Sequence, residues 1–273
     1  MEKSWSFATN AEMQAEINRI FANNGLQNVA VFTYDTVDST NTRAKLFAKS
    51  CGAGLTPAIF ISRAQSAGRG TRARSFESPL GAGLYMSILL PAHLVPENPA
   101  HLTSYTAVAV SRAIEGVTCG AVKPLIKWVN DLVVADKKLG GILTEASFCD
   151  NGEAFYVVGI GINLCPAPHS DEVSAIMTTL ADLGAPVSYT DFLCAVASEF
   201  FSSVSEYGSD RVTAEYRALS SLIGRQVILS GTEDGCIATV TDIDNDRAIV
   251  LRKDDGTLKK YVSGDVSIRP KGE

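Results

Sequence analysis

The chain has 273 residues, of which 46% are hydrophobic and 20% charged, as in an ordinary globular protein with room for one large and one small domain. Its net charge of −6 argues against a non-specific nucleic-acid binder, which would need a basic surface. The six cysteines form no CxxC pair and no stretch has the pattern of a signal peptide or membrane span, which predicts a cytoplasmic protein without a zinc site, disulfides or membrane contact.

Helical and strand patterns alternate through the first part of the chain. Apolar residues on one face indicate the first helix, and capping-type side chains at Asp38, Ser39 and Asn41 start the second. The expected elements in order are a helix over 11–24, a strand over 29–37, a helix from 38, a short buried strand over 58–62, an aperiodic loop over 63–79, a strand over 84–90 and a helix over 102–114.

The middle of the chain is rich in strands joined by tight turns. Strands are expected around Ile126 and over 132–135, 140–146 and 155–162, with turns at 136–137 and 150–152. Strands joined in this way are antiparallel, so the pattern predicts an α+β sheet and not a doubly wound one. Two further helices, over 191–207 and 210–219, can cover one face of that sheet.

After Ser221 the pattern changes to five short strands. They are expected over 225–229, 236–243, 248–252, 257–262 and 266–268, and turn residues separate them at regular spacing. This spacing predicts a small β-barrel. The chain therefore divides into an N-terminal helical extension over 1–28, a large α+β domain over 29–221 and a small domain over 222–273.

The aperiodic loop carries four arginines within twelve residues, from Arg63 to Arg74. Arginine binds phosphate or carboxylate through paired hydrogen bonds, and Gly68 and Gly70 permit a close backbone approach. The charges repel one another, which predicts a mobile segment that an anion orders. A solvated surface loop or an RNA-contacting segment is the alternative, whereas a GxxxxGK[ST] nucleotide loop is absent.

Four blocks of the sequence together resemble the biotin–protein ligases. In the family's order they are D-S-T-N at 38–41, Q-S-A-G-R-G at 65–70, K-W-V-N-D-L at 127–132 with K-L-G-G-I-L after it, and G-I-G-I-N at 159–163. The second block is similar to the start of the family's Q-x-x-G-R-G-R-x-G-R loop. Each block alone is a weak signal, but four in order are specific.

The resemblance implies a fold and a reaction. A mixed, largely antiparallel sheet of the biotin-ligase and class II synthetase type would form the catalytic domain, followed by an SH3-like barrel. The enzyme would use ATP and Mg²⁺ to convert biotin into biotinyl-5′-AMP, and would then transfer biotin to a lysine of a biotin carboxyl carrier protein or domain. The residues before Val29 are too few for a winged-helix domain, so no DNA partner is expected. Exposed sheet edges would permit two copies of the chain to pair as a homodimer.

The resemblance also assigns roles to single residues. Lys138 and Arg69 are expected catalytic groups, because adenylation brings a carboxylate and a phosphate together and needs positive charge around them. Asp131 is the third expected catalytic group; the resemblance places it near the ATP phosphates and Mg²⁺, where an electrostatic role is expected rather than proton abstraction. The residues expected at biotin are Ser39, Thr40, Asn41, Gln65, Arg69, Gly70, Thr71 and Lys138. Those expected at ATP or the adenylate are Arg72, Phe76, Lys127, Asn130, Asp131 and Asn163.

Simpler interpretations exist for several of these residues. Lys138 also fits an exposed turn lysine, Ser39 and Asn41 also fit helix caps, and Asp131 and Asn163 also fit turn residues. The three histidines have no cysteine or carboxylate at ligand spacing, so no protein-held metal site is expected.

The chain departs from the family's pattern at a few positions. Thr71 stands in place of a loop arginine, Ala73 in place of a glycine, Phe76 where tryptophan is common and Val129 in place of the proline of K-W-P-N-D. Two alternatives follow from the residues. One is a lipoate–protein ligase of the same superfamily, and the other is a non-catalytic module that binds an anionic partner.

Overall fold

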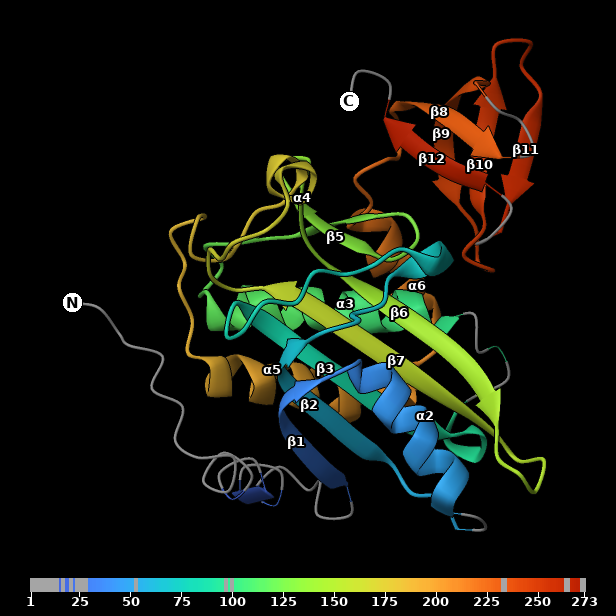
Figure 1. Cartoon of the computed structure of the whole chain (residues 1–273). Coiled ribbons are helices and arrows are strands. Elements are labelled where there is room, and N and C mark those ends of the chain that lie inside the picture. Colours follow the sequence, from blue (N-terminus) through green and yellow to red (C-terminus); the bar gives the residue numbers. More distant parts are fainter. Residues whose placement is uncertain are drawn as a thin grey trace.

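Two β-sheets organise the part of the chain that the structure describes (Figure 1). The computed structural model describes residues 29–51, 54–95, 98, 101–231, 235–262 and 266–270, together with residues 15, 18, 19 and 22. The helix expected over 11–24 and the N-terminal extension over 1–28 lie outside this set, apart from those four positions.

The large sheet has seven strands in the order β1-β2-β3-β7-β6-β5-β4. Their bounds are β1 Ala30–Val37, β2 Ala58–Gln65, β3 Gly83–Pro91, β4 Leu125–Lys127, β5 Asp131–Val134, β6 Lys137–Phe148 and β7 Ala154–Asn163. The β1–β2 pair is parallel, because the helix between these strands returns the chain to the same end of the sheet. The other described pairs of this sheet are antiparallel, which confirms a mixed, largely antiparallel α+β sheet.

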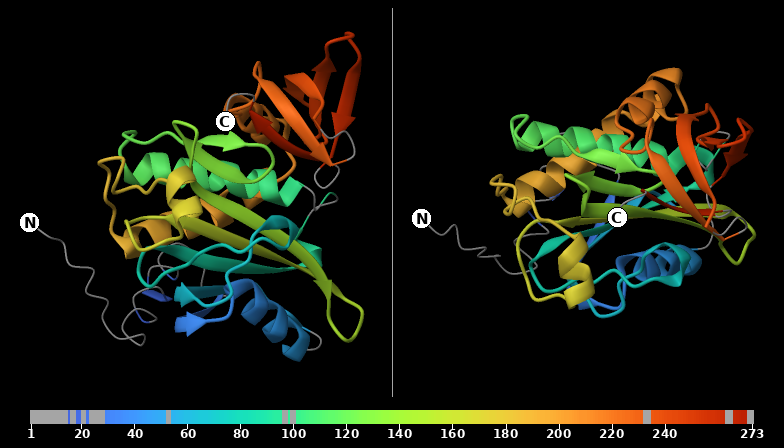
Figure 2. Two further views of the ribbon diagram at one scale, coloured as in Figure 1. Left: turned by 45° about the horizontal axis from the view of Figure 1, so that its top comes forward. Right: turned by 90° about the horizontal axis from the view of Figure 1, so that it is seen from above.

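Helices cover both faces of this sheet (Figure 2). They are α2 Thr40–Cys51, α3 His101–Val117, α4 Asp171–Ile176, α5 Tyr189–Ser202 and α6 Asp210–Ala218. The helices α3, α5 and α6 pack on one face around a core in which the rings of Tyr105 and Phe200 lie 5.3 Å apart. On the other face, α2 packs against β2, β3 and β7 beside a smaller apolar cluster that includes Phe60 and Phe155. No helix in the described ranges is long and apolar enough to cross a membrane.

The β5–β6 hairpin sets the position of Lys138. Ala135 and Asp136 form its two-residue turn with φ values of 49° and 61°, as a type I′ turn requires. The turn therefore lies one residue earlier than the expected 136–137, and Lys137 and Lys138 open β6. In the paired register Lys138 lies opposite Val133 and Gly141 opposite Asp131.

Several elements differ in extent from the sequence-based expectation. Part of the expected aperiodic loop continues β2 as far as Gln65, and the short 3-10 helix η1 covers Thr71–Ala73. The helix expected over 191–207 ends at Ser202, and a 3-10 turn, η3, covers Val204–Glu206. Helix α4 was not expected at all. The 3-10 helix η2 over Ala92–Leu94 follows β3.

The C-terminal domain contains an antiparallel sheet of five strands in the order β11-β10-β9-β8-β12. The strands are β8 Gln226–Gly231, β9 Ile237–Ile243, β10 Ile249–Lys253, β11 Leu258–Tyr261 and β12 Val266–Pro270. Its contact with the large domain includes a hydrogen bond of 2.9 Å from Trp128 Nε1 to the carbonyl oxygen of Arg247. Arg225 also lies 2.6 Å from Asp136, beside the β5–β6 turn.

Candidate active site

The arginine loop crosses the large sheet on the face that also carries α2 (Figures 1 and 2). Residues of this loop, of α2 and of the strands line a cavity of about 410 Å³. Its floor comes from β3, β6 and β7, and the loop and α4 form walls. The structure brings most of the expected site residues together here, namely Ser39, Thr40, Asn41, Gln65, Arg69, Gly70, Thr71, Phe76, Asn130, Lys138 and Asn163. Arg72, Lys127 and Asp131 are outside the set of residues that line the cavity.

One end of the cavity is polar and tightly hydrogen-bonded. The side-chain oxygen of Gln65 accepts from the backbone N–H of Thr40 at 2.9 Å and from its hydroxyl at 3.2 Å. Ser87, which is fully buried, lies 2.7 Å from the Thr40 hydroxyl and 2.6 Å from Asn41 Oδ1. Ser39 directly precedes α2 and is also buried. These polar groups are therefore held in fixed directions, as recognition of a small polar ring requires.

Glu145 does not line the cavity itself but contacts residues of this end, and the sequence analysis missed it. Its carboxylate accepts from Asn41 Nδ2 and from Lys45 Nζ, each at 2.9 Å, and Arg69 lies 3.0 Å away. Burial by itself raises the pKa of Glu145, but the hydrogen bonds from Asn41 and Lys45 and the nearby charges outweigh it and lower the pKa below its ordinary value. Glu145 is therefore an anion that orients Asn41 and Arg69.

Two glycines of β7 let neighbouring groups approach the floor of the cavity. A side chain at Gly159 would collide with the amide of Asn41, and one at Gly161 would meet the ring of Phe76 at 2.8 Å. The G-I-G-I-N block thus supplies bare backbone on which Asn41 and Phe76 rest.

Lys138 reaches the cavity from the start of β6. Its ammonium lies 2.7 Å from Asp131 Oδ1, which also accepts from Asn130 Nδ2 at 3.1 Å. Gly141 makes room for this pair, because a side chain there would lie 3.1 Å from Asp131 Oδ1 and 3.4 Å from the Lys138 ammonium. Lys138 is thus a restrained cation in the wall of a cavity, and the exposed-turn interpretation does not describe it.

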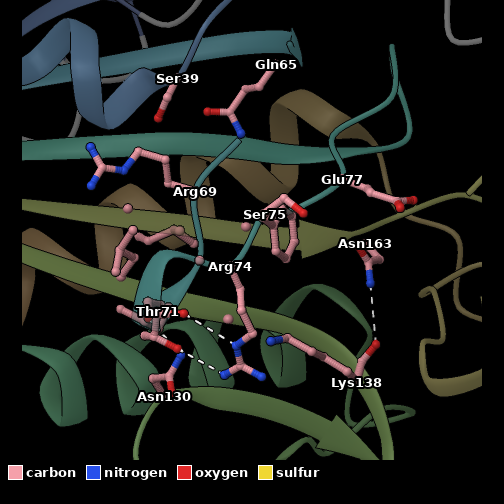
Figure 3. A pocket seen from close by; sticks show the side chains of 18 of the residues that line it. Ser39, Gln65, Arg69, Thr71, Arg74, Ser75, Glu77, Asn130, Lys138 and Asn163 are labelled. Carbon is pink, nitrogen blue, oxygen red and sulfur yellow. Dashed lines mark hydrogen bonds between the residues drawn. The ribbon is translucent and has the colours of Figure 1, made fainter. Parts of the chain in front are cut away.

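The arginines of the loop differ in their position relative to the cavity. Arg74 lines the cavity, and its guanidinium donates to the carbonyl and to the hydroxyl of Thr71 at 3.4 and 3.3 Å (Figure 3). Arg72, with φ of 57°, is exposed at the tip. Arg74 is therefore the second loop cation at the cavity beside Arg69. The clustering of arginines gave a signal for Arg74, but not for its orientation.

Asn163 ends β7 beside Lys138. Its amide donates to the carbonyl oxygens of Lys138 at 3.4 Å and Thr178 at 3.3 Å (Figure 3 shows the first contact). Both N–H groups of the amide are engaged with backbone, so Asn163 holds two walls of the cavity together. Lys127, the last residue of β4, is paired in register with Asp131 and is half-buried.

The remaining walls are apolar, and the side chains that form them include Met86, Ile142, Leu143, Ile160, Val173 and Met177. A site with a polar end, apolar walls and cations suits a ligand with a polar ring, an aliphatic chain and an anionic group. Within the described ranges no group of three or more His, Cys, Asp or Glu side chains could hold a metal ion. All six cysteines are free thiols.

Two family models match the sequence. The model of the biotin/lipoate A/B protein ligase family matches residues 34–163, and the model of the biotin protein ligase C-terminal domain matches residues 222–269. The first match contains all four sequence blocks.

Curated relatives match over most of this chain. The biotin–[acetyl-CoA-carboxylase] ligase of Paracoccus denitrificans is 29% identical over 225 residues, which are 79% of this chain and 91% of that protein. The bifunctional ligase/repressor BirA of Salmonella typhimurium is 26% identical over 258 residues, which are 93% of this chain and 78% of that protein.

Solved structures share the fold. The biotin protein ligase from Aquifex aeolicus in complex with biotin and ATP superposes with a TM-score of 0.74 at 23% identity, covering 88% of this chain and 99% of that one. The biotin protein ligase from Leishmania major in complex with biotinyl-5-AMP gives a TM-score of 0.61 at 24% identity and covers 86% of this chain and 99% of that one. These likenesses confirm the expected fold class.

Proposed function

The chain belongs to the biotin/lipoate A/B protein ligase family, and we propose that its cavity activates biotin with ATP and transfers the biotinyl group to a lysine of a carrier protein. The observation that carries this proposal is the composition of one cavity. Arg69, Arg74 and Lys138 border it, its remaining walls are largely apolar, and a rigid polar cluster closes one end.

The polar end suits the ureido ring of biotin, which offers two donors and one acceptor. Ser39, Thr40, Asn41 and Gln65 present hydroxyl and amide groups there, and the apolar walls accommodate the bicyclic ring and the valeryl chain. Gly70 and Thr71 lie on the loop where the carboxylate end of biotin would meet the cations.

In the first step a carboxylate oxygen of biotin attacks the α-phosphorus of ATP, and the bond to pyrophosphate breaks. Both reactants are anionic, so Lys138, Arg69 and Arg74 position them and stabilise the charge of the pentacoordinate transition state. Asp131 keeps the Lys138 ammonium in place and acts electrostatically. Phe76, Asn130 and the more distant Arg72 and Lys127 are the groups proposed at the nucleotide.

Mg²⁺ accompanies ATP in this proposal. Protein sites usually hold Mg²⁺ through one or two carboxylates together with substrate phosphates. Asp131 and the side-chain oxygen of Asn130 fit such a limited donor set, and the ion would neutralise phosphate charge when bound.

In the second step a lysine amine attacks the acyl carbon of the mixed anhydride and AMP leaves. The proposed acceptor is a biotin carboxyl carrier protein or domain, in the cytoplasm. Its lysine has to reach the cavity. The exposed sheet edges would also permit two copies of this chain to pair as a homodimer.

The test is pyrophosphate exchange into ATP with biotin, lipoate or octanoate as the acid. Exchange that depends on biotin alone supports the proposal, whereas exchange with lipoate would assign the related lipoate ligase activity. Absence of exchange with every acid, together with anion binding that weakens in salt, would indicate a non-catalytic module.

A further inference from the structure

The segment over 169–177 forms a wall of the cavity without being held by a core. Helix α4 within it has six residues, and none of the six is buried. Val173, Ile176 and Met177 have the i, i+3, i+4 spacing of one helix face, and all three line the cavity. A helix this short is not stable by itself, so its position depends on the contacts at its two ends.

The C-terminal end of this segment is tied to the strand that carries Lys138. The backbone N–H of Thr178 donates to the carbonyl of Lys138 at 3.0 Å, and Met177 forms an isolated parallel bridge with Lys138. The amide of Asn163 donates to the carbonyls on both sides of this junction. This end therefore follows the sheet.

The N-terminal end is tied to the arginine loop through the side chain of Glu77. Its Oε1 accepts from the Ser170 hydroxyl at 2.6 Å, and its Oε2 accepts from the Ser170 backbone N–H at 3.0 Å. The ring nitrogen Nδ1 of His169, which also lines the cavity, lies 3.0 Å from the same Oε2. The hydrogen bonds from Ser170 are the main cause that lowers the pKa of Glu77. Both carboxylate oxygens are thus engaged by two consecutive residues.

Glu77 itself stands in the anchored base of the loop. The backbone N–H of Phe76 donates to Gly68 at 2.9 Å, the Phe76 ring rests over Gly161, and Gln65 Nε2 donates to the Ser78 hydroxyl at 2.8 Å. A chain of contacts therefore runs along the cavity, from the loop through Glu77 to the 169–177 segment, and from there to Lys138. Glu77 is the side chain that joins the loop to this segment.

We propose that Glu77 is a positioning residue that fastens the 169–177 segment to the arginine loop and thereby retains the acyl-adenylate until the acceptor lysine arrives. This inference rests on the proposed function. A mixed anhydride hydrolyses in water, so a wall that closes over it protects the intermediate from escape and from solvent. Glu77 acts through the wall and not on the reacting atoms.

The experiment compares Glu77→Ala and Glu77→Gln with the wild type. Preformed biotinyl-adenylate is expected to leave Glu77→Ala about tenfold faster, because charge-assisted hydrogen bonds that are partly exposed are lost. Glutamine keeps one acceptor oxygen for Ser170, so Glu77→Gln should release the adenylate at an intermediate rate. The release rate should change by a larger factor than the rate of adenylate formation. Glu172→Ala, which removes an exposed carboxylate from α4, is the matched control and should release it at the wild-type rate.

Hydrogen exchange gives a second measurement that needs no reaction. Backbone amides of 169–176 should exchange faster in Glu77→Ala than in the wild type or Glu172→Ala, all without ligand. Wild-type release from Glu77→Ala, or unchanged exchange, would overturn the inference. If the wild type formed no biotinyl-adenylate, the proposed function would fail, and the exchange result would still decide whether Glu77 holds the segment.

Discussion

Each cationic side chain at this cavity contacts a polar or acidic neighbour, so the effect of substituting the cation also depends on that neighbour. Lys138 is paired with Asp131, Arg69 lies against Glu145, and Arg74 donates to Thr71. Each pair fixes the direction of a cation before any anion enters, and such preorganisation is what makes electrostatic catalysis effective. A cation that was free to rotate would lose entropy on binding the ligand.

Lys138→Ala is expected to slow biotinyl-adenylate formation by about a hundredfold, since one charged contact to the reacting centre contributes about 3 kcal/mol. The ion pair with Asp131 is partly exposed, so the free energy of unfolding should change little. Single-turnover formation of the adenylate measures the effect. Lys137→Ala removes the exposed neighbouring lysine and is the control. A near-normal rate in Lys138→Ala would show that another cation does this work.

Thr71 stands where the family's loop pattern has an arginine, and the structure shows Arg74 held against it. Arg74→Ala is therefore expected to release biotinyl-adenylate about ten- to hundredfold faster, because a charge-assisted hydrogen bond is lost. Thr71→Arg should slow release, and in the double variant it should offset the loss of Arg74. Lys49→Ala, which removes an exposed cation of α2 that does not line the cavity, is the control and should release the adenylate at the wild-type rate. Equal dissociation rates for all variants would mean that these loop positions do not hold the phosphate.

Whole elements were predictable where their pattern repeats over several residues. The strands of both sheets and the helices α3 and α6 follow from apolar periodicity and turn residues, because burial on one face imposes that periodicity. Helix α4 has no buried residue and left no such pattern. The helix expected over 191–207 ends early because Ser203 departs from helical geometry, with φ of −101° and ψ of 7°.

The candidate site was predictable in its blocks but not in its connections. Glu145 lies two residues beyond the K-L-G-G-I-L block and shares its strand face with Gly141 and Leu143, so the period of two along β6 was a usable signal for it. Glu77 and His169 are 92 residues apart, and no local pattern indicates that they meet. Contacts of this kind depend on the register of the sheet, which the sequence determines only through the whole fold.

The arginine loop should respond to ligand as a unit. Its base is held by the Phe76–Gly68 hydrogen bond, whereas its tip at Arg72 is exposed. Trypsin is therefore expected to cut after Arg72 in the protein alone, and biotin with ATP should slow that cut. The time course of the cleavage with biotin, with lipoate and with neither measures this. Equal cleavage in all three conditions would mean that the loop does not close on the ligand.

The two domains meet next to the segment that carries Asn130 and Asp131. Trp128, two residues earlier, is buried and donates to the carbonyl of Arg247 in the C-terminal domain. The side chain of Arg247 donates to the hydroxyl of Ser104 of α3. Each domain therefore donates a hydrogen bond to the other. The C-terminal domain therefore supports the start of β5, and its docking should affect the nucleotide end of the cavity.

Trp128→Phe keeps an aromatic ring but removes the donor, which leaves the buried Arg247 carbonyl without that hydrogen bond. We expect the free energy of unfolding to fall by about 1–3 kcal/mol, as for other buried groups that lose their partner. The KM for ATP should rise in pyrophosphate exchange, because Asn130 and Asp131 follow on the loosened segment. Urea unfolding followed by circular dichroism gives the stability change. Arg225→Ala breaks the exposed ion pair with Asp136 at the same domain boundary and should cost less than about 1 kcal/mol. If both variants lost the same small amount of unfolding free energy and kept the wild-type KM for ATP, docking of the C-terminal domain would have no effect on the nucleotide site.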